Sequence, residues 1–255
     1  MVTSIRNVMP KIGGRKLFHM LSNQLKEIGV GRDMLFRILR ANHMLITPKK
    51  SYHITTNSHH RFRKHKNLIE NIQIIEPEQI WVSDITYIGN RKNPMYLSLV
   101  TDAYSKMVVG YDVSNSLNTE GSLRALKMAT KSRVYKENIL IHHSDRGLQY
   151  CSNEYQALLT KSKIRCSMTE TYDPYANAVA ERINGILKQE FIGENRNIEI
   201  KIMKELVRDS VGIYNNIRPH YSCYMNTPKF MHQQNEIKIK TYKTKNTSKH
   251  VFAGM

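Results

Sequence analysis

The spacing of apolar residues changes from helical to strand-like along the chain, and it predicts the order of the elements. Apolar residues recur at helical spacing over 15–28 and again over 33–43, and Gly29 and Gly31 lie between the two runs. Two short helices joined by a glycine-containing turn, the second one basic, are typical of a helix-turn-helix. Any small helical hairpin would show the same pattern, so the hairpin alone does not establish DNA binding.

From residue 79 the pattern becomes that of strands, and it predicts a mixed α/β sheet. Three apolar runs follow one another closely enough for an antiparallel meander, at 79–88, 95–100 and 107–113. Helices and strands then alternate, at 119–132, 139–141, 153–160 and 164–168. A meander followed by alternating helices and strands indicates a mixed sheet with helices packed on it.

A helix predicted over 172–191 organises the middle of the chain. Asp173 and Pro174 suit its first turn, where an acidic cap and proline are favoured. At 100° per residue, one face carries the polar residues Asn177, Glu181, Asn184 and Lys188, and the opposite face carries Val179, Ile183, Ile186 and Leu187. Taken alone, this pattern also fits an ordinary amphipathic surface helix.

Charge divides the chain into two basic flanks and a nearly neutral middle. The whole chain has 39 Lys and Arg against 21 Asp and Glu, a net charge of +18. Residues 1–75 carry 14 basic and 3 acidic side chains, residues 76–192 carry 14 and 13, and residues 193–255 carry 11 and 5. Flanks of this kind favour a polyanion as partner over a merely solvated basic surface.

Arginines on the second N-terminal helix are the candidate DNA contacts of the first flank, namely Arg32, Arg37 and Arg40. The tract 49–66, rich in Lys, Arg and His, is either a linker that lies along phosphates or a plain connector.

Cysteine spacing and apolar run length exclude several classes of protein. The three cysteines lie far apart and form no C-x-x-C pair, so we expect neither a disulfide framework nor a structural zinc site. No apolar run approaches the roughly 20 residues that cross a bilayer. We therefore expect an intracellular, cytoplasmic protein without a membrane partner.

Three acidic residues stand where a metal-dependent site would need them. Asp84 lies inside an apolar strand, Asp145 ends another strand, and Glu181 lies on the organising helix. Magnesium prefers oxygen ligands, so these carboxylates would form a cradle if the two strands are neighbours and the helix crosses their ends. Spacing alone leaves Asp102 as a competing member of the set.

Three motifs resemble the integrase catalytic core of insertion-sequence transposases of the OrfB type, which are similar to retroviral integrases. They are W-V-S-D-I-T-Y at 81–87, H-H-S-D-R-G-L-Q-Y at 142–150 and D-P-Y-A-N-A-V-A-E-R-I-N-G-I-L-K-Q-E at 173–190. Thirty-five residues separate Asp145 from Glu181, as in the D,D(35)E group of this family. Y-N-N-I-R-P-H at 214–220 and N-T-P at 226–228 resemble the family's C-terminal signature.

The resemblance implies a ribonuclease H-like fold: a mixed five-stranded sheet with flanking helices, preceded by a small all-α helix-turn-helix domain. It implies two Mg²⁺ or Mn²⁺ ions held by Asp84, Asp145 and Glu181, which leaves Asp102 outside the triad. It also implies nicking at the transposon end and strand transfer by the freed 3′-hydroxyl. We assign further DNA contacts to Lys188, Asn177, Asn184 and Arg146.

We expect five segments: a helix-turn-helix region, a basic linker, the catalytic core, a C-terminal helical part of the core, and a basic disordered tail. Their ranges are 1–48, 49–75, 76–192, 193–235 and 236–255. The expected partners are transposon ends and target DNA, further copies of the chain, and an upstream OrfA portion. Such a protein would be associated with the bacterial nucleoid.

Three other functions remain open at this point. The chain could be a DNA-binding regulator without chemistry, or a partial transposase subunit that needs an OrfA portion. It could also be a nuclease of the same fold that only hydrolyses.

Overall fold

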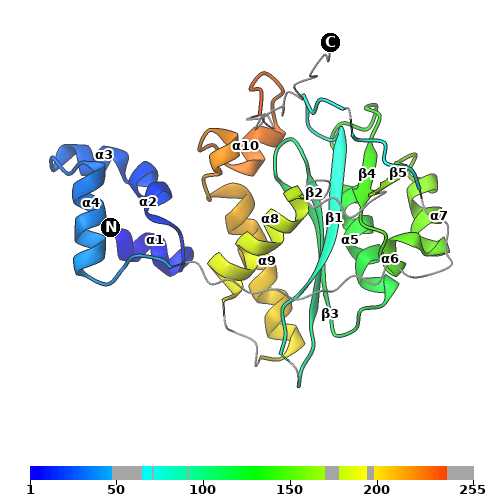
Figure 1. Ribbon diagram of the computed structural model, residues 1–255, viewed down its shortest axis with the longest axis horizontal. Coiled ribbons are helices and arrows are strands. Elements are labelled where there is room, and N and C mark those ends of the chain that lie inside the picture. The colour runs from blue at the N-terminus through cyan, green and yellow to red at the C-terminus, as the bar shows by residue number, and fades with distance from the viewer. Residues whose placement is uncertain (48–64, 71, 91, 170–177, 194–197, 240–255) are drawn as a thin grey trace, which may run out of the picture.

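The computed structural model describes residues 1–47, 65–70, 72–90, 92–169, 178–193 and 198–239. Its centre is a five-stranded sheet with the order β3-β2-β1-β4-β5 (Figure 1). The strands are β1 Ile80–Tyr87, β2 Tyr96–Asp102, β3 Val108–Ser114, β4 Ile141–Ser144 and β5 Arg165–Met168. The first three strands pair antiparallel, whereas β4 is parallel to both β1 and β5. The predicted mixed five-stranded sheet is confirmed.

Helices cover both faces of the sheet, and the alternation of side chains along β1 decides which residues each layer buries. One face packs against α5 Thr119–Ser132, α6 Leu148–Cys151 and α7 Asn153–Lys161. Trp81 and Ile85 point into this layer. Ile80 and Val82 point to the other face, which is covered by α8 Ala178–Ile186 and α9 Ile200–Asn216. Both faces of β1 are therefore apolar, as its sequence indicates.

The strand expected at 139–141 is displaced along the chain. Ile139 is 71% exposed, and β4 instead runs from Ile141 to Ser144. The reason is the parallel pairing with Ile80–Ser83 of β1, which draws His142 and His143 into the sheet. The local pattern does not predict this shift, because histidine and serine are not among the residue types enriched in strands.

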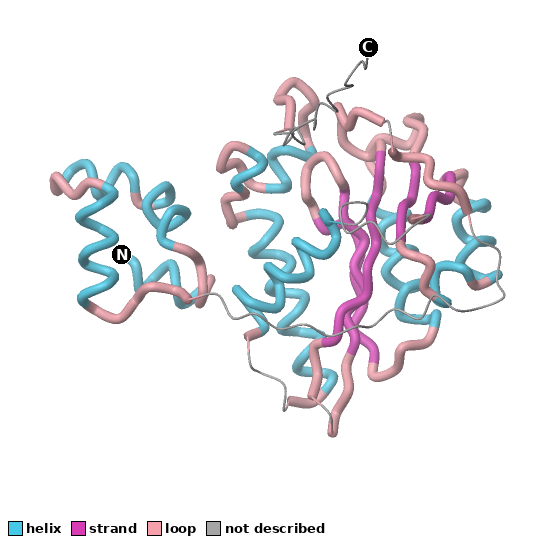
Figure 2. The backbone as a smooth tube through the Cα atoms, viewed as in Figure 1, coloured by secondary structure: helices cyan, strands magenta, loops and turns pink. Residues whose placement is uncertain are grey.

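The N-terminal helices form a small all-α group with its own apolar interior. They are α1 Val2–Val8, α2 Gly14–Met20, α3 Ser22–Glu27 and α4 Arg32–Ala41. The single helix expected over 15–28 is wrong: it breaks at Leu21, and Gly29 turns the chain toward α4 with a φ of +67°. Figure 2 shows this group beside the sheet domain. The apolar cluster around Met9 and Ile12 continues into Phe191 and Ile192.

The helix that was predicted over 172–191 has two parts in the structure. Its predicted start, including Asp173, Pro174 and Asn177, lies outside the described residues. The α8 helix continues as a π-helix, η1 Leu187–Ile192, and the chain leaves it through Gly193 at a φ of +62°. The apolar spacing does not predict this π-helix, because spacing along one segment does not report the hydrogen-bond register of a single turn.

The C-terminal segment closes the sheet domain. After α9 come the 3₁₀ turn η2 Tyr221–Cys223 and the short helix α10 Pro228–His232. The side chain of Asn215 accepts from the backbone N–H of Val108 (3.0 Å) and donates to its carbonyl (2.9 Å). This side chain thereby occupies backbone groups on the outer side of edge strand β3. Nothing in the described ranges combines the length and apolar character needed for a helix to cross a bilayer.

The five segment boundaries stay predictions. Most of the expected linker and nearly all of the expected tail, 48–64 and 240–255, lie outside the described residues.

Two glycines provide a test of this packing. A Cβ on Gly110 in β3 would lie 2.1 Å from the carbonyl oxygen of Ala125 in α5, whereas a Cβ on Gly212 in α9 would meet nothing within 4 Å. We expect Gly110→Ala to lower the free energy of unfolding by about 1–3 kcal/mol through overpacking. Gly212→Ala should raise it by about 0.5–1 kcal/mol, because alanine favours the helix. Urea denaturation measures both, and equal shifts in the two variants would contradict the packing described.

Candidate active site

The parallel pairing of β1 with β4 brings two acidic residues to the same end of the sheet. Ser83 lies opposite Ser144, so Asp84, in the middle of β1, and Asp145, directly after the end of β4, follow as neighbours. Asp84 points to the face of the sheet that α8 covers, because side chains alternate along a strand and Ser83 and Ile85 point to the opposite face, toward α5. Open α/β sheets usually bind ligands at such strand ends.

The carboxylate of Asp84 is held by two hydrogen bonds. Asn184 Nδ2 of α8 donates to Asp84 Oδ2 (2.7 Å), and the backbone N–H of Ile85 donates to Oδ1 (2.9 Å). Burial, and then the charge of Asp145, raise the pKa of Asp84 to about 7 against the lowering effect of these hydrogen bonds. The charge of Glu181 raises the same pKa further. All three acids therefore belong to one electrostatic cluster.

The other two carboxylates have different surroundings. Asp145 Oδ1 accepts from the backbone N–H of Gly147 (3.0 Å), and a Cβ on Gly147 would approach that oxygen to 3.1 Å. Glu181 lies in the first turn of α8, where the helix dipole favours a negative charge. The residue as a whole is exposed, although partial burial of its carboxyl raises the pKa of Glu181.

The residue types of this site suit a divalent metal ion better than their positions do. Carboxylate oxygens fit a hard divalent cation such as Mg²⁺. Within the part of the chain that the structure describes, however, no three His, Cys, Asp or Glu side chains converge closely enough to hold a metal ion. Asn184 donates to one oxygen of Asp84, and Glu181 is exposed.

The polar residues of the organising helix do not share one environment. Asn184 is only 4% exposed and contacts Asp84, although the helical wheel put it on the open polar face. Lys188 is partly buried, and its Nζ donates to Thr86 Oγ1 (3.3 Å), two residues beyond Asp84 on β1. Asn177 lies outside the described residues. The solvent-facing polar side of this helix therefore contains fewer residues than the sequence predicts.

The remaining arginines lie in two places. Arg146 is partly buried, immediately after Asp145. On α4, the side chains of Arg32, Arg37 and Arg40 are exposed, and Arg32 forms an ion pair with Asp33 (2.9 Å).

Asp102, the competing acid, is used elsewhere. It lies opposite Trp81, at the other end of β1 from Asp145, and is fully buried. Its two oxygens accept from the backbone N–H groups of Glu78 and Ser105, each at 2.7 Å. Ser105 Oγ also donates to it at 2.7 Å. Asp102 therefore organises a turn and stays apart from the acidic cluster.

Two buried histidines support the strand end behind Asp145. The ring of His142 hydrogen-bonds through Nε2 with Ser83 Oγ (2.7 Å) and with Tyr155 OH (2.9 Å). His143 Nδ1 pairs with Ser167 Oγ (2.9 Å). Burial lowers the pKa of His142 to about 3 and that of His143 to about 4, so both rings are neutral. They fix β4 between its neighbours.

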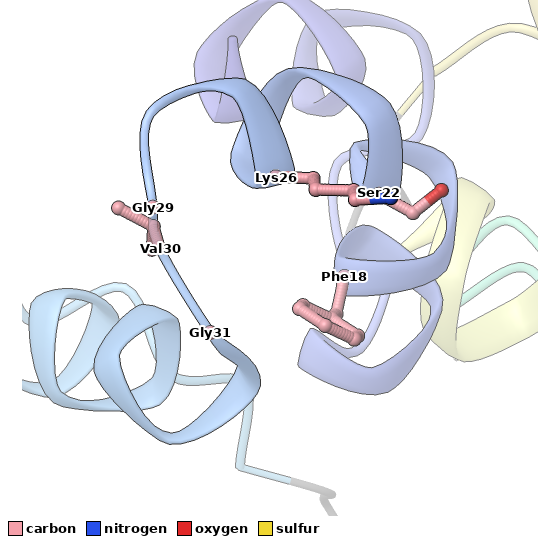
Figure 3. Close-up of a pocket in the computed structure, with 6 residues that line it drawn as sticks. All are labelled: Phe18, Ser22, Lys26, Gly29, Val30 and Gly31. Carbon is pink, nitrogen blue, oxygen red and sulfur yellow. The ribbon is translucent and has the colours of Figure 1, made fainter.

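A hollow of about 390 Å³ lies away from these acids, among the N-terminal helices. Figure 3 shows its lining of Phe18, Ser22, Lys26, Gly29, Val30 and Gly31. It is formed by α2, α3 and the turn before α4, and it contains no acidic, histidine or cysteine side chain. The candidate chemistry therefore stays at the sheet.

Known families and proteins match both the sequence and this geometry. The Integrase core domain family matches residues 75–174, and a second Integrase core domain family matches residues 162–228. The 31 kDa protein of insertion element IS600 from Shigella sonnei is 33% identical over 207 residues, which cover 78% of this chain and 75% of that protein. The chain belongs to the insertion-sequence transposases with an integrase core domain.

Escherichia coli K12 transposases are further relatives. InsF of insertion sequence IS3fB is 34% identical over 172 residues, which cover 67% of this transposase and 59% of InsF. InsF of IS3A is 35% identical over 160 residues, which cover 62% of this chain and 55% of InsF. The chain thus spans less than two thirds of the length of the InsF proteins.

Solved structures show the same fold. A chain of the simian T-cell lymphotropic virus intasome, solved with PP2A regulatory subunit B56 gamma, matches with a TM-score of 0.55 and 21% identity, covering 93% of this chain and 81% of that chain. The HTLV-2 integrase catalytic core domain, solved with magnesium, matches with a TM-score of 0.50 and 19% identity, covering 62% and 98%. The expected ribonuclease H-like fold is confirmed.

The raised pKa of Asp84 predicts an unusual pH dependence of stability. A carboxyl whose pKa rises on folding binds more protons in the native state, so stability falls as pH rises from about 4 to about 7. Without divalent cations, Asp84→Asn should therefore gain on the order of a few kcal/mol over the unmodified protein at pH 8 and little at pH 4. Urea unfolding at the two pH values measures this. The control Asp209→Asn, on the exposed side of α9, should show no such difference.

Proposed function

We propose that this transposase nicks DNA at the ends of its element and joins the freed 3′-hydroxyl to target DNA, with Asp84, Asp145 and Glu181 as the catalytic acids. The observation that supports this most directly is the electrostatic coupling of the three carboxylates at one strand end, in a chain with an integrase core domain. The charges of Asp145 and Glu181 both raise the pKa of Asp84, and a cation beside that carboxylate would offset them.

Two Mg²⁺ or Mn²⁺ ions are the cofactors we propose, because all the donors are carboxylate oxygens. When bound, such ions would neutralise charge on the phosphate and favour in-line displacement. The magnesium in the HTLV-2 core structure is consistent with this choice. Within the chain, Asn184 fixes the direction of the Asp84 carboxylate. Glu181, being exposed on α8, can change rotamer to complete the set.

DNA would be bound by two groups of residues in this proposal. Near the acids, Lys188 and Arg146 would contact phosphates or bases, and Asn177 and Asn184 are kept as weaker candidates. On the N-terminal helices, the exposed Arg32, Arg37 and Arg40 would face DNA from α4. The helix-turn-helix region would recognise the element end, and the core would cut it.

The assembly and the location in the cell are also proposals. Two element ends must be brought together, so we propose an oligomer on DNA, with an OrfA portion as a further partner. A transposase acts where the chromosome is, so we place this one in the bacterial cytoplasm with the nucleoid.

Replacing Glu181 tests the catalytic assignment. Glu181→Gln keeps the shape of the side chain and removes its charge, so we expect loss of cutting and joining by on the order of a hundredfold or more with DNA binding retained. Labelled element-end DNA incubated with the protein and Mg²⁺ or Mn²⁺ reports all three. The matched control is Glu120→Gln, an exposed acid in the first turn of α5, which should cut normally.

Each outcome of that assay separates the candidate functions. Joined products support a transposase, nicks without joining indicate a nuclease, and binding without either indicates a regulator or an incomplete subunit. Normal cutting by Glu181→Gln would show that the three acids are not the active site.

Divalent cations should also change stability, independently of any reaction. An ion that binds only the folded state stabilises it by about 2.7 kcal/mol when its free concentration is about 100 times its Kd. We therefore expect MgCl₂ to raise the melting temperature of the unmodified protein and to raise that of Asp84→Asn much less. KCl at equal ionic strength is the control, and equal effects of the two salts would argue against a metal at Asp84.

A further inference from the structure

The helix that carries Glu181 is tied to two distant parts of the chain through one side chain. Glu190 lies on η1, and its carboxylate accepts both guanidinium nitrogens of Arg218, from Nε to Oε2 and from Nη2 to Oε1, each at 2.7 Å. Lys16 Nζ of α2 donates to the same Oε1 at 3.3 Å. Arg218 belongs to the Y-N-N-I-R-P-H segment, to which the proposed function gives no role.

The Arg218–Glu190 pair is a buried, fixed contact. The side chain of Arg218 is 1% exposed and that of Glu190 is 16% exposed. The guanidinium lies 5.6 Å from the ring centre of Tyr214, and its Nη1 donates to the carbonyl of Pro219 (3.3 Å). Burial raises the pKa of Glu190, but Arg218, with a smaller part from Lys16, more than reverses this and leaves it below its ordinary value. A two-pronged pair of this kind holds its partners in one orientation.

The pair sits where the helix changes its period. The backbone N–H of Gly193 donates to the carbonyl of Lys188 (2.8 Å), five residues earlier, as a π-turn requires. The carbonyl of Glu190 accepts from the backbone N–H of Lys11, in the segment between α1 and α2 (3.3 Å). π-turns are uncommon and frequently lie at functional sites. Here Glu190 connects the turn to other parts of the chain with both its side chain and its backbone.

The direction of Lys188 depends on this turn. Lys188 is the second residue of η1 and lies two positions before Glu190, and its Nζ reaches Thr86 on β1, beside the acidic cluster. A return of η1 to regular α-helical winding would rotate the residues that follow Leu187 relative to β1.

We propose that Arg218 and Glu190 are positioning residues that hold η1 in its π-turn and thereby direct Lys188 to DNA beside the acidic cluster. The inference rests on the proposed function for the role of Lys188 in DNA binding. Through Lys16, the same carboxylate also fastens the N-terminal helices to the helix that bears Glu181.

A double-mutant cycle on DNA binding tests the proposal without requiring cleavage. Log K falls as log salt concentration rises, and Lys188→Ala should make this fall shallower by about 0.9 in slope, the value for one phosphate contact. Arg218→Lys keeps the charge and loses the two-pronged geometry, so it should reduce the slope in the same way. The double variant should bind no more weakly than Lys188→Ala alone, because both changes remove one contact. Arg208→Lys, in the exposed pair with Asp209 on α9, is the matched control and should bind normally.

Glu190→Gln separates the proposal from simple electrostatics, because the two predict opposite changes in DNA binding. Removal of a negative charge should strengthen DNA binding by simple electrostatics, whereas lost positioning of Lys188 should weaken it several-fold. Hydrogen exchange of a peptide spanning 186–193 should be faster in this variant and in Arg218→Lys at temperatures where both remain folded. The exchange measurement also applies if one variant is too unstable for binding assays.

Three results would overturn the proposal: additive losses in the cycle, an unchanged slope in Lys188→Ala, or stronger binding by Glu190→Gln. A failure of the proposed function is distinguishable, because an unmodified protein that binds but never cuts leaves the binding cycle intact.

Discussion

The burial of Asp84 in an apolar strand is the constraint on which the site depends. A carboxylate there must be hydrogen-bonded, paired with a cation, or protonated. The fold supplies two donors, from Asn184 and from the backbone of Ile85, yet it also brings Asp145 and Glu181 near, which raises the pKa of Asp84 to about 7. An ionised Asp84 therefore costs stability, and the proposed cation would reduce that cost.

Asp102 shows the opposite solution within the same sheet. It is more deeply buried than Asp84, but its oxygens accept three hydrogen bonds from Glu78 and Ser105. His232 lies beside it, and the hydrogen bonds and charges of Asp102 and Glu78 raise the pKa of His232 to about 9 despite its burial. Asp102 is compensated and holds α10 to the core, whereas the two hydrogen bonds to Asp84 compensate its charge only in part. The contrast separates a structural carboxylate from a catalytic candidate by physical environment.

Charge also links the parts of the molecule. The C-terminal signature resembles family motifs and contains none of the three proposed catalytic acids. Its residues instead hold other elements in place. Asn215 caps the edge of β3, Tyr214 OH donates to the carbonyl of Lys106 (2.8 Å), and Arg218 binds Glu190. These contacts hold α9 against both the sheet and the helix that carries Glu181. Sequence signatures far from the chemistry can therefore mark the supports of a site.

The sequence determined the mixed sheet and most of its elements, because apolar periodicity is a local property. The bounds of α5 agree with the prediction, whereas the three acids come from motifs that resemble the family, and their catalytic role stays a prediction. Tertiary structure decided which polar groups meet. It turned Asn184 toward Asp84, placed two histidines in β4, and formed the π-turn of η1 where Arg218 binds Glu190. These outcomes depend on partners about 30 to 100 residues away, and spacing along one segment contains no information about them.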